Sequence, residues 1–473
     1  MLTQLPFSRQ TPPCPFHVTS VLCMRTHSSL AGEDCRHSEF VTVTMAPQYA
    51  PSLRSRLPIV TLLLEIIFLL LFVFFVKIEH QDQVYREFDR KTFILLYAEF
   101  QDVHVMIFLG FGFLATFLVR YGFSGSGFNM LVAAMAIQWS VLMNGFLLPQ
   151  RHHNREIYIN MKSVIEAELC AASALIAMGA VHGKLNPVQL LLMALLEVTG
   201  FVVNQWILQT LLRADLLYSI MLLHIFGGFF GVMASWVLHR DRIKPKHEKE
   251  KTDRRTGLFS MLGTLFLWIF WPSFNAAVVY QKWDRGLKLS VIYGTYLSLA
   301  VSVVVAMTVS MLTSSKGKMN MVHVQGSVLS GGVAIGVAMT AVHTPWIAMT
   351  IGLCAALLSS LGFRYMKGHM LLAFECHDTC GVLNVHAIPG ILGWLAHLFL
   401  RVASTERTIA LEFAVHHICV LFITLCMSLV RGMATGLFLK LSIWRPQQDR
   451  KCFDDQAFWK VIGRFNPHTL QYH

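Results

Sequence analysis

The chain has 473 residues, of which 55% are hydrophobic and 14% are charged, and its mean hydropathy is +0.53. Soluble domains carry about 25% charged residues, so this composition excludes an ordinary soluble globular protein. The net charge of +12 does not indicate a nucleic-acid partner, because the basic residues cluster in the two tails and in the segment Arg240–Arg255, with no stripe of interleaved aromatic residues.

The first 53 residues form the expected cytoplasmic amino-terminal segment (1–53). Residues 1–44 are polar and rich in Cys, His, Ser and Thr, and their apolar run is too short for the core of a signal peptide. A second methionine, Met45, opens a compact segment that leads into the first apolar stretch, where Arg54 and Arg56 hold the leading end inside. We expect Met45 to be the natural start and residues 1–44 to be disordered or a start-site artefact.

Twelve apolar stretches in residues 54–441 are long enough to cross a bilayer as helices, which takes about 20 mostly apolar residues. Each is too long and too evenly apolar for a strand of a membrane β-barrel. The sequence thus predicts an all-α polytopic membrane domain of twelve transmembrane helices, followed by a cytoplasmic tail at 442–473. The predicted spans are 57–76, 103–121, 128–148, 163–181, 187–212, 216–238, 258–280, 289–313, 321–342, 345–363, 379–402 and 412–441.

The basic segments predict the orientation of the chain. Twelve spans place both tails and the central loop Arg240–Arg255 on one side of the membrane, which the positive-inside rule makes cytoplasmic. The loop is expected to link two halves of the chain and to attract anionic lipid.

The cysteines predict neither a disulfide framework nor a metal site. Five of the ten lie in predicted spans, and no CxxC or zinc-type spacing occurs. We expect no cofactor. The chain also lacks an Asn-x-Ser/Thr sequon, so N-glycosylation is not expected.

Two histidines lie inside uninterrupted apolar stretches, each shortly before a glycine: His224 in LHIFGGFFG and His386 in NVHAIPGILG. A charged residue inside a span costs about 2.5–3.5 kcal/mol on insertion scales, and ionisable groups there usually face a bundle interior or a pathway. Either histidine alone could be a core residue bonded to a nearby carbonyl. Two in similar contexts, one in each half of the chain, favour a duplicated half-channel with a paired centre.

Other ionisable residues in the spans have simpler interpretations. Glu65 and Glu197 are expected to bond within the bundle or to a neighbouring helix rather than to carry ions. His104 and His323 stand near predicted span starts, where an interfacial position is the default. The adjacent pair His416–His417 points to two faces of one helix, so its two rings cannot chelate one metal. The spaced histidine boxes of a membrane desaturase are absent, and we expect no enzyme.

Small residues and prolines predict features of helix packing. The GxxxG motifs at 227–231 and 332–336 allow close helix approach and are expected to serve packing within one protomer. Pro272 and Pro389 are expected to kink the seventh and eleventh spans beside pore residues.

Several long segments resemble the Rh branch of the ammonium transporter/Rh superfamily, from about Arg54 to Lys460. They are HVMIFLGFGFLATFLVRYGF (His104–Phe123), GTLFLWIFWPSFNAA (Gly263–Ala277), GKMNMVHVQGSVLSGGVAIG (Gly317–Gly336) and DTCGVLNVHAIPGILG (Asp378–Gly393). The tail CFDDQAFWK (Cys452–Lys460) and the missing sequon are more similar to the non-glycosylated Rh blood group polypeptides, here of a non-mammalian vertebrate, than to the Rh glycoproteins.

The resemblance implies a trimer in which each protomer encloses a narrow apolar pore between two inverted five-helix repeats, the second to sixth and the seventh to eleventh spans. It implies that His224 and His386 face each other midway along the pore. Phe274 matches the inner of two gate positions beneath the outer mouth, and Leu169 occupies the outer one. Asp378 matches a membrane-buried aspartate of the family.

Four positions depart from the pattern of conducting relatives. Their aspartate eight residues before the first pore histidine corresponds to Leu216, and Asp215 replaces it only if the helix start shifts. Their vestibule glutamate matches Gln205, and their outer phenylalanine matches Leu169. Glu168 replaces an aspartate beside it, which conserves the charge.

The chemistry favours passage of neutral ammonia. An ammonium ion must shed its water to enter a dry constriction, which costs far more than thermal energy. Buried histidines suit such a pore because burial favours their neutral form. An apolar lumen would exclude hydrated sodium and potassium.

We therefore expect an ammonia/ammonium channel of the plasma membrane with both termini cytoplasmic. His386 supports this function, because mammalian blood group polypeptides have lost the second pore histidine. Two alternatives stay open. One is a poorly conducting structural subunit of an erythrocyte-type Rh complex, homotrimeric or heterotrimeric with an Rh-associated glycoprotein and linked to the membrane skeleton. The other is a conduit for carbon dioxide.

Overall fold

The computed structural model describes residues 56–79, 86–148, 152–153, 156–239, 249–279 and 285–460. The predictions for Met45, Arg54 and residues 1–44 lie outside these residues, as does most of the loop Arg240–Arg255. The predicted division at residues 53 and 441 therefore stays a prediction.

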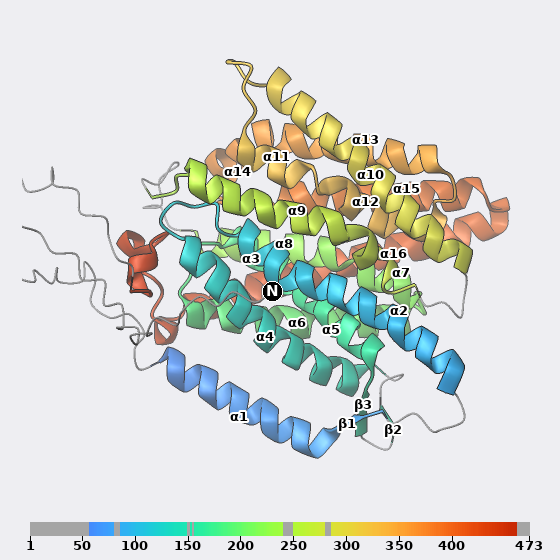
Figure 1. Ribbon diagram of the computed structural model, residues 1–473, viewed down its shortest axis with the longest axis horizontal. Helices are drawn as coiled ribbons and strands as arrows, with labels where there is room; N and C mark the ends of the chain where they lie inside the picture. The colour runs from blue at the N-terminus through green and yellow to red at the C-terminus, as the bar shows by residue number, and fades with distance from the viewer. Residues whose placement is uncertain are drawn as a thin grey trace, which may run out of the picture. The chain divides into compact units, whose positions relative to one another are not determined.

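Twelve helical runs follow one another along the described chain, as the sequence predicts (Figure 1). Eleven of the described helices are long and apolar enough to cross a membrane by themselves. The bounds are α1 (Leu57–Phe75), α4 (Gly122–Leu147), α5 (Met161–Ala180), α6 (Pro187–Thr210), α7–α8 (Leu216–Met221, Leu223–Val237), α9 (Arg254–Ala276), α10 (Arg285–Leu312), α11–α12–η4 (Met321–Ser327, Ser330–Ala338, Met339–Ala341), α13–η5–α14 (Pro345–Leu361, Gly362–Met366, Lys367–Phe374), η6–α15 (Leu383–Ala387, Ile388–Ala403) and α16 (Arg407–Lys440).

The remaining helical run, which is the second in chain order, corrects the predicted span 103–121. It consists of α2 (Arg86–Val105), the π-helical η2 (Met106–Gly110) and α3 (Phe111–Leu114). Its start was misplaced because its first turns read REFDRK, so a hydropathy window does not register them. The predicted span 345–363 also ends too early, since α14 continues to Phe374.

Several helices begin at a residue whose side chain caps the free backbone N–H groups. Asn160, Asn186 and Asp253 each accept a hydrogen bond from the backbone N–H three residues later, and each makes a reciprocal capping box. Pro187 follows Asn186 at the first helical position, where its missing N–H costs nothing. These local signals fix where α5, α6 and α9 enter the bundle.

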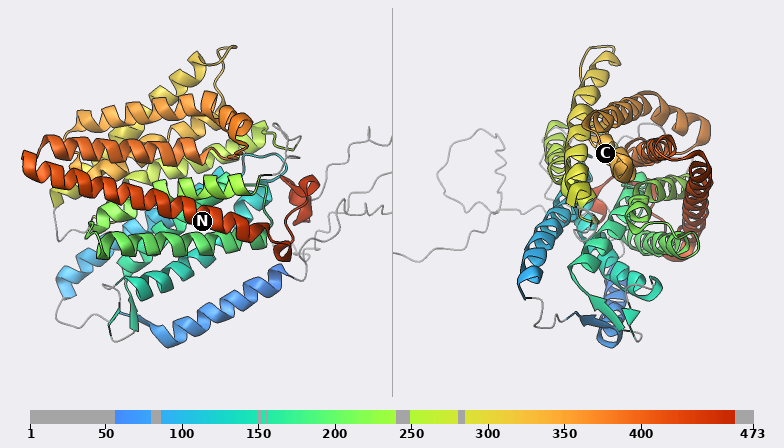
Figure 2. Two further views of the ribbon diagram at one scale, coloured as in Figure 1. Left: turned by 180° about the vertical axis from the view of Figure 1, so that it is seen from behind. Right: turned by 90° about the vertical axis from the view of Figure 1, so that its right-hand side faces the viewer.

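The two halves of the chain pack in the same pattern. In the first half, α4 packs against α5 and α6, and α5 packs against α8; in the second, α10 packs against α12 and α13, and α12 packs against α15. The helices α2 and α3 join the halves by packing on α9. Because five is an odd number, the second copy of a five-span repeat crosses the membrane in the opposite direction to the first. The predicted inverted five-helix repeat is therefore confirmed. The right-hand view of Figure 2 looks roughly along the helix axes.

The two GxxxG motifs mark equally close contacts in both halves. Gly227 and Gly231 of α8 lie against the backbone of Ser173 and Ala177 in α5, where an added Cβ would come within 2.5–2.6 Å. In the second half, Gly332 and Gly336 lie against side chains of α9, within 2.7 Å of an added Cβ. The prediction that these motifs serve packing within one protomer is confirmed.

The helix α1 lies at the periphery of the bundle, with most of its large apolar side chains exposed (Figure 1). Its end continues into β1 (Val76–Ile78), which pairs in parallel with β3 (Glu156–Ile159), and β3 pairs antiparallel with β2 (His152–His153). The sequence did not predict this small sheet, whose three-residue β1 is too short to show alternation. It ties α1 to the segment that leads into α5.

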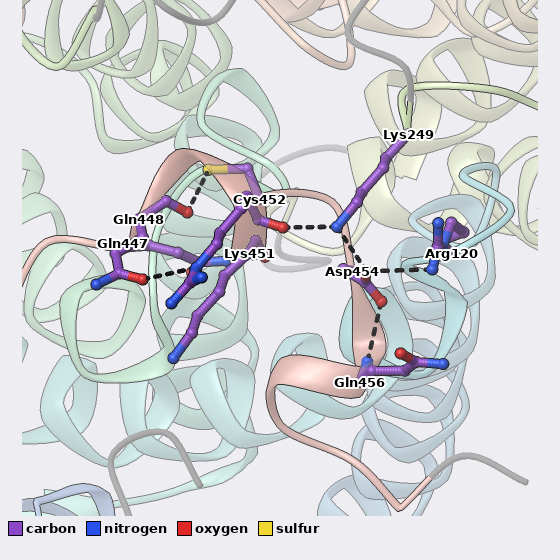
Figure 3. A network of polar contacts seen from close by, with 9 residues as sticks. Arg120, Lys249, Gln447, Gln448, Lys451, Cys452, Asp454 and Gln456 are labelled. Carbon is purple, nitrogen blue, oxygen red and sulfur yellow. Dashed lines mark hydrogen bonds and ion pairs between the residues drawn. The ribbon is translucent and has the colours of Figure 1, made fainter. Parts of the chain in front are cut away.

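The segment 442–460 folds back onto one end of the bundle, here termed the tail side. Asp455 accepts hydrogen bonds from the backbone N–H groups of Phe123 and Ser124, at 2.9 and 2.7 Å, and so caps α4. Asp454 bonds Lys249 at 2.7 Å and Arg120 at 3.4 Å (Figure 3). Asp454 and Asp455 thus connect the tail to α4 and to the end of the central loop. The opposite end of the bundle is termed the far side.

Candidate functional site

The two predicted pore histidines meet inside the bundle. The Nδ1 atoms of His224 in α8 and His386 in η6 lie 3.3 Å apart, and the ring centroids lie 5.3 Å apart with the planes at 19°. Both rings are buried. Two imidazoles at this distance share one hydrogen bond, in which one Nδ1 donates and the other accepts. The Nε2 of His224 has no hydrogen-bond partner among the described residues, so it can form a hydrogen bond with another molecule.

The local geometry around His386 follows from Pro389. A proline inside an α-helix has no N–H to donate, and its ring meets the carbonyl four residues earlier, here Val385. The segment Leu383–Ala387 relieves that conflict by adopting a π-helical turn. His386 lies in this widened turn, so the disturbance expected at Pro389 takes the form of the π-helix. Pro272 lies inside α9.

Asp378 holds the start of the helix that carries His386. Its two carboxylate oxygens accept hydrogen bonds from the backbone N–H groups of Gly381 and Leu383, both at 2.9 Å. Gly381 has φ +77°, a conformation that favours glycine. Asp378 therefore caps the start of the helical segment that contains His386.

The first half lacks an equivalent cap. Asp215 is exposed at the start of α7, and its side chain makes no capping hydrogen bond. Leu216, at the position that matches the family aspartate, is half-buried. The structure therefore does not bring Asp215 into the group around the histidine pair.

Aromatic rings cover the pair towards the far side. Phe274 and Trp271, both in α9, lie 6.0 and 5.9 Å from the ring of His224 and 5.9 Å from each other. Both are buried. The predicted gate residue Phe274 thus contacts His224 of the pair, and no pattern in the sequence separately indicated Trp271.

Glu168 contacts a residue that the sequence analysis assigned to the membrane interface. Its Oε1 lies 2.6 Å from Nδ1 of His104, and the carboxylate is buried. His104 lies well inside the helical run rather than near its start, because α2 begins at Arg86. His104 also lies between two rings of its own run, Phe100 and Phe108.

The remaining departures from the family pattern lie in the bundle core. Leu169 is fully buried in α5. Gln205 is buried in α6, where its Oε1 lies 3.9 Å from the thiol of Cys170. Neither residue shares a described contact with the histidine pair.

The structure supports the structural interpretation of the lone glutamates. The Ser173 hydroxyl donates to Glu197 at 2.5 Å, and the Gln138 amide donates to Glu65 at 3.2 Å. These are bonds between neighbouring helices, as expected. His323 lies near the start of α11 and stacks on Phe363.

The adjacent histidines of α16 point to different partners, as predicted. His416 bonds the Leu212 carbonyl at 2.7 Å, whereas His417 contacts the Tyr218 hydroxyl at 3.1 Å and His397 at 3.3 Å. Among the described residues, no group of three or more His, Cys, Asp or Glu side chains is arranged to hold a metal ion.

A cavity of about 80 Å³ begins at His386 and extends towards the tail side. A cavity of this size has room for small molecules such as water or ammonia. Its wall is mainly apolar, and Asn129, Gln325 and His182 are its other polar members. The structure thus places a buried histidine pair between aromatic rings and a small apolar cavity.

Acidification is expected to destabilise the fold through His182, which lies between α5 and α6. Burial lowers the pKa of His182 from 6.5 to about 4. Because the folded-state pKa lies below the unfolded one, this contribution to stability is complete above about pH 6.5 and falls as the pH drops towards 4. Between pH 7.5 and 5.0 the free energy of unfolding should decrease by about 2 kcal/mol from this group. The unfolding temperature should fall less between these two pH values for His182→Gln than for the wild type. Equal falls in the two proteins would contradict the prediction.

Comparison with known proteins agrees with this geometry. The model of the Ammonium Transporter Family matches residues 64–458. The chain is 39% identical to Ammonium transporter Rh type C of Xenopus tropicalis over 439 residues, 86% of this chain and 93% of that protein. It is 38% identical to Ammonium transporter Rh type A of Bos taurus over 424 residues, with 87% and 96% covered.

Among solved structures, the chain is similar to Rh50 of Nitrosomonas europaea, with 29% identity, a TM-score of 0.68, and 79% of this chain and 94% of that chain covered. Mep2 of Saccharomyces cerevisiae shares the fold at 16% identity and a TM-score of 0.61, with 78% and 89% covered. The family match covers most of the chain, and the matched residues include His224, His386, Asp378 and Phe274. The chain is therefore a multi-pass membrane protein of the ammonium transporter family, with relatives of the Rh type.

Proposed function

We propose that the protein is a channel for ammonia and ammonium, with the His224–His386 pair as the centre of its pore. The observation that carries the proposal is this pair, two stacked rings whose Nδ1 atoms lie 3.3 Å apart, enclosed by aromatic rings and open to a small cavity. Like charges at this distance repel strongly, so at most one of the two rings carries a positive charge at a time. It offers a polar edge to ammonia without providing a site for a hydrated cation.

The surrounding residues have distinct roles in this proposal. Phe274 restricts access from the far side, and Glu168 with His104 forms the polar approach where an ammonium ion is held and loses its water. Asp378 fixes the helix start and thereby the ring of His386. Leu169 makes the outer gate less aromatic than in conducting relatives, and Asp215 contributes only a surface charge.

We also propose the assembly and orientation that the family implies. Each protomer of a trimer has its own pore, in the plasma membrane. The tail side is cytoplasmic, which agrees with the basic residues Arg120 and Lys249 at that end. The trimer is a homotrimer or includes an Rh-associated glycoprotein.

A second candidate function is a poorly conducting structural subunit of an Rh complex linked to the membrane skeleton. Three features favour it: Asp215 is exposed, Gln205 is buried without charge, and Leu169 replaces a ring. A third candidate is carbon dioxide conduction, which the apolar cavity wall favours. Carbon dioxide uptake by proteoliposomes with the wild-type protein, compared with protein-free liposomes, tests this third candidate.

Proteoliposomes containing the wild-type protein are expected to take up ammonia and methylammonium faster than protein-free liposomes in stopped-flow measurements. His386→Ala should slow this uptake at least about tenfold, because it removes half of the hydrogen-bonding centre. His416→Ala is the matched control, since His416 lies in a span but outside the pore, and it should leave uptake unchanged. Equal, slow uptake by wild type and His386→Ala would instead support the structural subunit.

A further inference from the structure

A third histidine lines the pore cavity. His182 lies in the loop between α5 and α6 and borders the same cavity as His386. The side chain is buried, yet its Nε2 has no hydrogen-bond partner among the described residues. A buried ring nitrogen without a partner, on a residue that borders a cavity, is unusual, because buried polar groups nearly always have one.

The surrounding residues fix the orientation of this ring. Phe117 stacks on it with centroids 5.7 Å apart and planes at 24°, and Tyr121 meets it edge-on at 5.0 Å. The Ala115 carbonyl accepts a hydrogen bond from the ring of His182, and this bond favours the protonated form of the ring. The ring nitrogen that donates there carries the single proton of a neutral imidazole, so Nε2 is left as an acceptor.

The ring is neutral under ordinary conditions. Burial, helped by the charge of Lys184, lowers the pKa of His182 to about 4. The Lys184 ammonium is held elsewhere, by the Ser235 hydroxyl at 2.8 Å and by the carbonyl of His377. The lone pair of Nε2 therefore remains available to an incoming N–H group at neutral pH.

The loop is also held from outside. Gly183 has φ +78°, and the ring of Phe453 lies where its Cβ would stand. The backbone N–H of Phe453 donates to the Gly183 carbonyl at 2.8 Å. The tail therefore fixes the loop directly beside His182.

We propose that His182 is a substrate-binding residue at the tail side of the pore, where its Nε2 accepts a hydrogen bond from ammonia or ammonium that has passed the His224–His386 pair. This inference rests on the proposed channel function and extends it to a second binding position. Asn129 and Gln325 are the polar neighbours of this position along the cavity. Carbon dioxide has no hydrogen to donate, so the position selects for N–H substrates.

The test compares wild type, His182→Leu and His182→Gln in proteoliposomes, with ammonia, methylammonium and carbon dioxide as separate substrates. Leucine fills the site without an acceptor, whereas glutamine restores one. We expect His182→Leu to slow ammonia uptake about fivefold, the effect of one lost hydrogen bond, and His182→Gln to recover at least half of the rate. Any carbon dioxide uptake should be the same in all three proteins. A leucine effect that glutamine does not rescue, or one that also lowers carbon dioxide uptake, would indicate a packing role and overturn the proposal.

Ammonia uptake by His182→Leu equal to that of the wild type would also overturn the proposal. If His182→Leu does not reconstitute, His182→Met replaces it, because its flexible apolar chain fills the same space. If the wild type and His386→Ala differ but His182→Leu matches the wild type, the channel stands and this inference fails. If the wild type is no faster than protein-free liposomes, both fail.

Discussion

Replacement of Asp378 by alanine is expected to leave little folded protein and to abolish conduction in what remains. The carboxylate accepts two backbone hydrogen bonds at the start of the helix that carries His386, and it is buried. A hydrogen bond to a charged group contributes about 1.5–3 kcal/mol, so the loss of two amounts to about 3–6 kcal/mol. The free energy of unfolding of a typical protein is only about 5–15 kcal/mol, so this loss is a large part of it.

The measurement is the unfolding temperature of purified protein, followed by ammonia uptake in proteoliposomes. Asp215→Ala is the matched control, because Asp215 begins the equivalent helix of the first half but is exposed and makes no capping bond. It should change stability by no more than about 0.5 kcal/mol. Wild-type stability in Asp378→Ala would show that the cap does not hold the pore helix.

Replacement of Gly231 by alanine is expected to separate α8 from α5 and to misplace His224. A Cβ at Gly231 would lie 2.6 Å from the Ala177 carbonyl oxygen and 2.7 Å from its Cα. Because these atoms are backbone, the contact cannot be relieved by a side-chain rotation, and overpacking of this kind costs about 1–3 kcal/mol or more. Both the unfolding temperature and ammonia uptake should fall.

Gly368→Ala tests whether the effect comes from this contact. Gly368 also lies in a helix, α14, but an added Cβ there meets no atom within 4 Å. Alanine should therefore stabilise that helix by up to about 1 kcal/mol through its better propensity. If Gly231→Ala behaved like Gly368→Ala, the close approach of α8 and α5 would not be required.

Two histidines, His104 and His182, illustrate how little the residue type alone says about the role of a side chain. In the sequence the two residues look alike, since His104 stands at the start of the predicted span 103–121 and His182 directly follows the span 163–181. The structure gives one of them a carboxylate partner, Glu168, and the other a cavity. The chemistry of each follows from a residue on another helix, so no local pattern could have distinguished them.

The sequence by itself determined the membrane class, most of the spans, the duplicated halves and the candidate histidine pair. Bilayer thickness imposes spans of about 20 apolar residues, and the expense of a polar group in hydrocarbon makes His224 and His386 stand out. Only the tertiary structure decided the start of α2, the capping role of Asp378, the exposure of Asp215 and the place of His182 in the cavity. These depend on hydrogen bonds and close contacts between segments far apart in the chain, which the packing of the helices creates and a linear pattern does not contain.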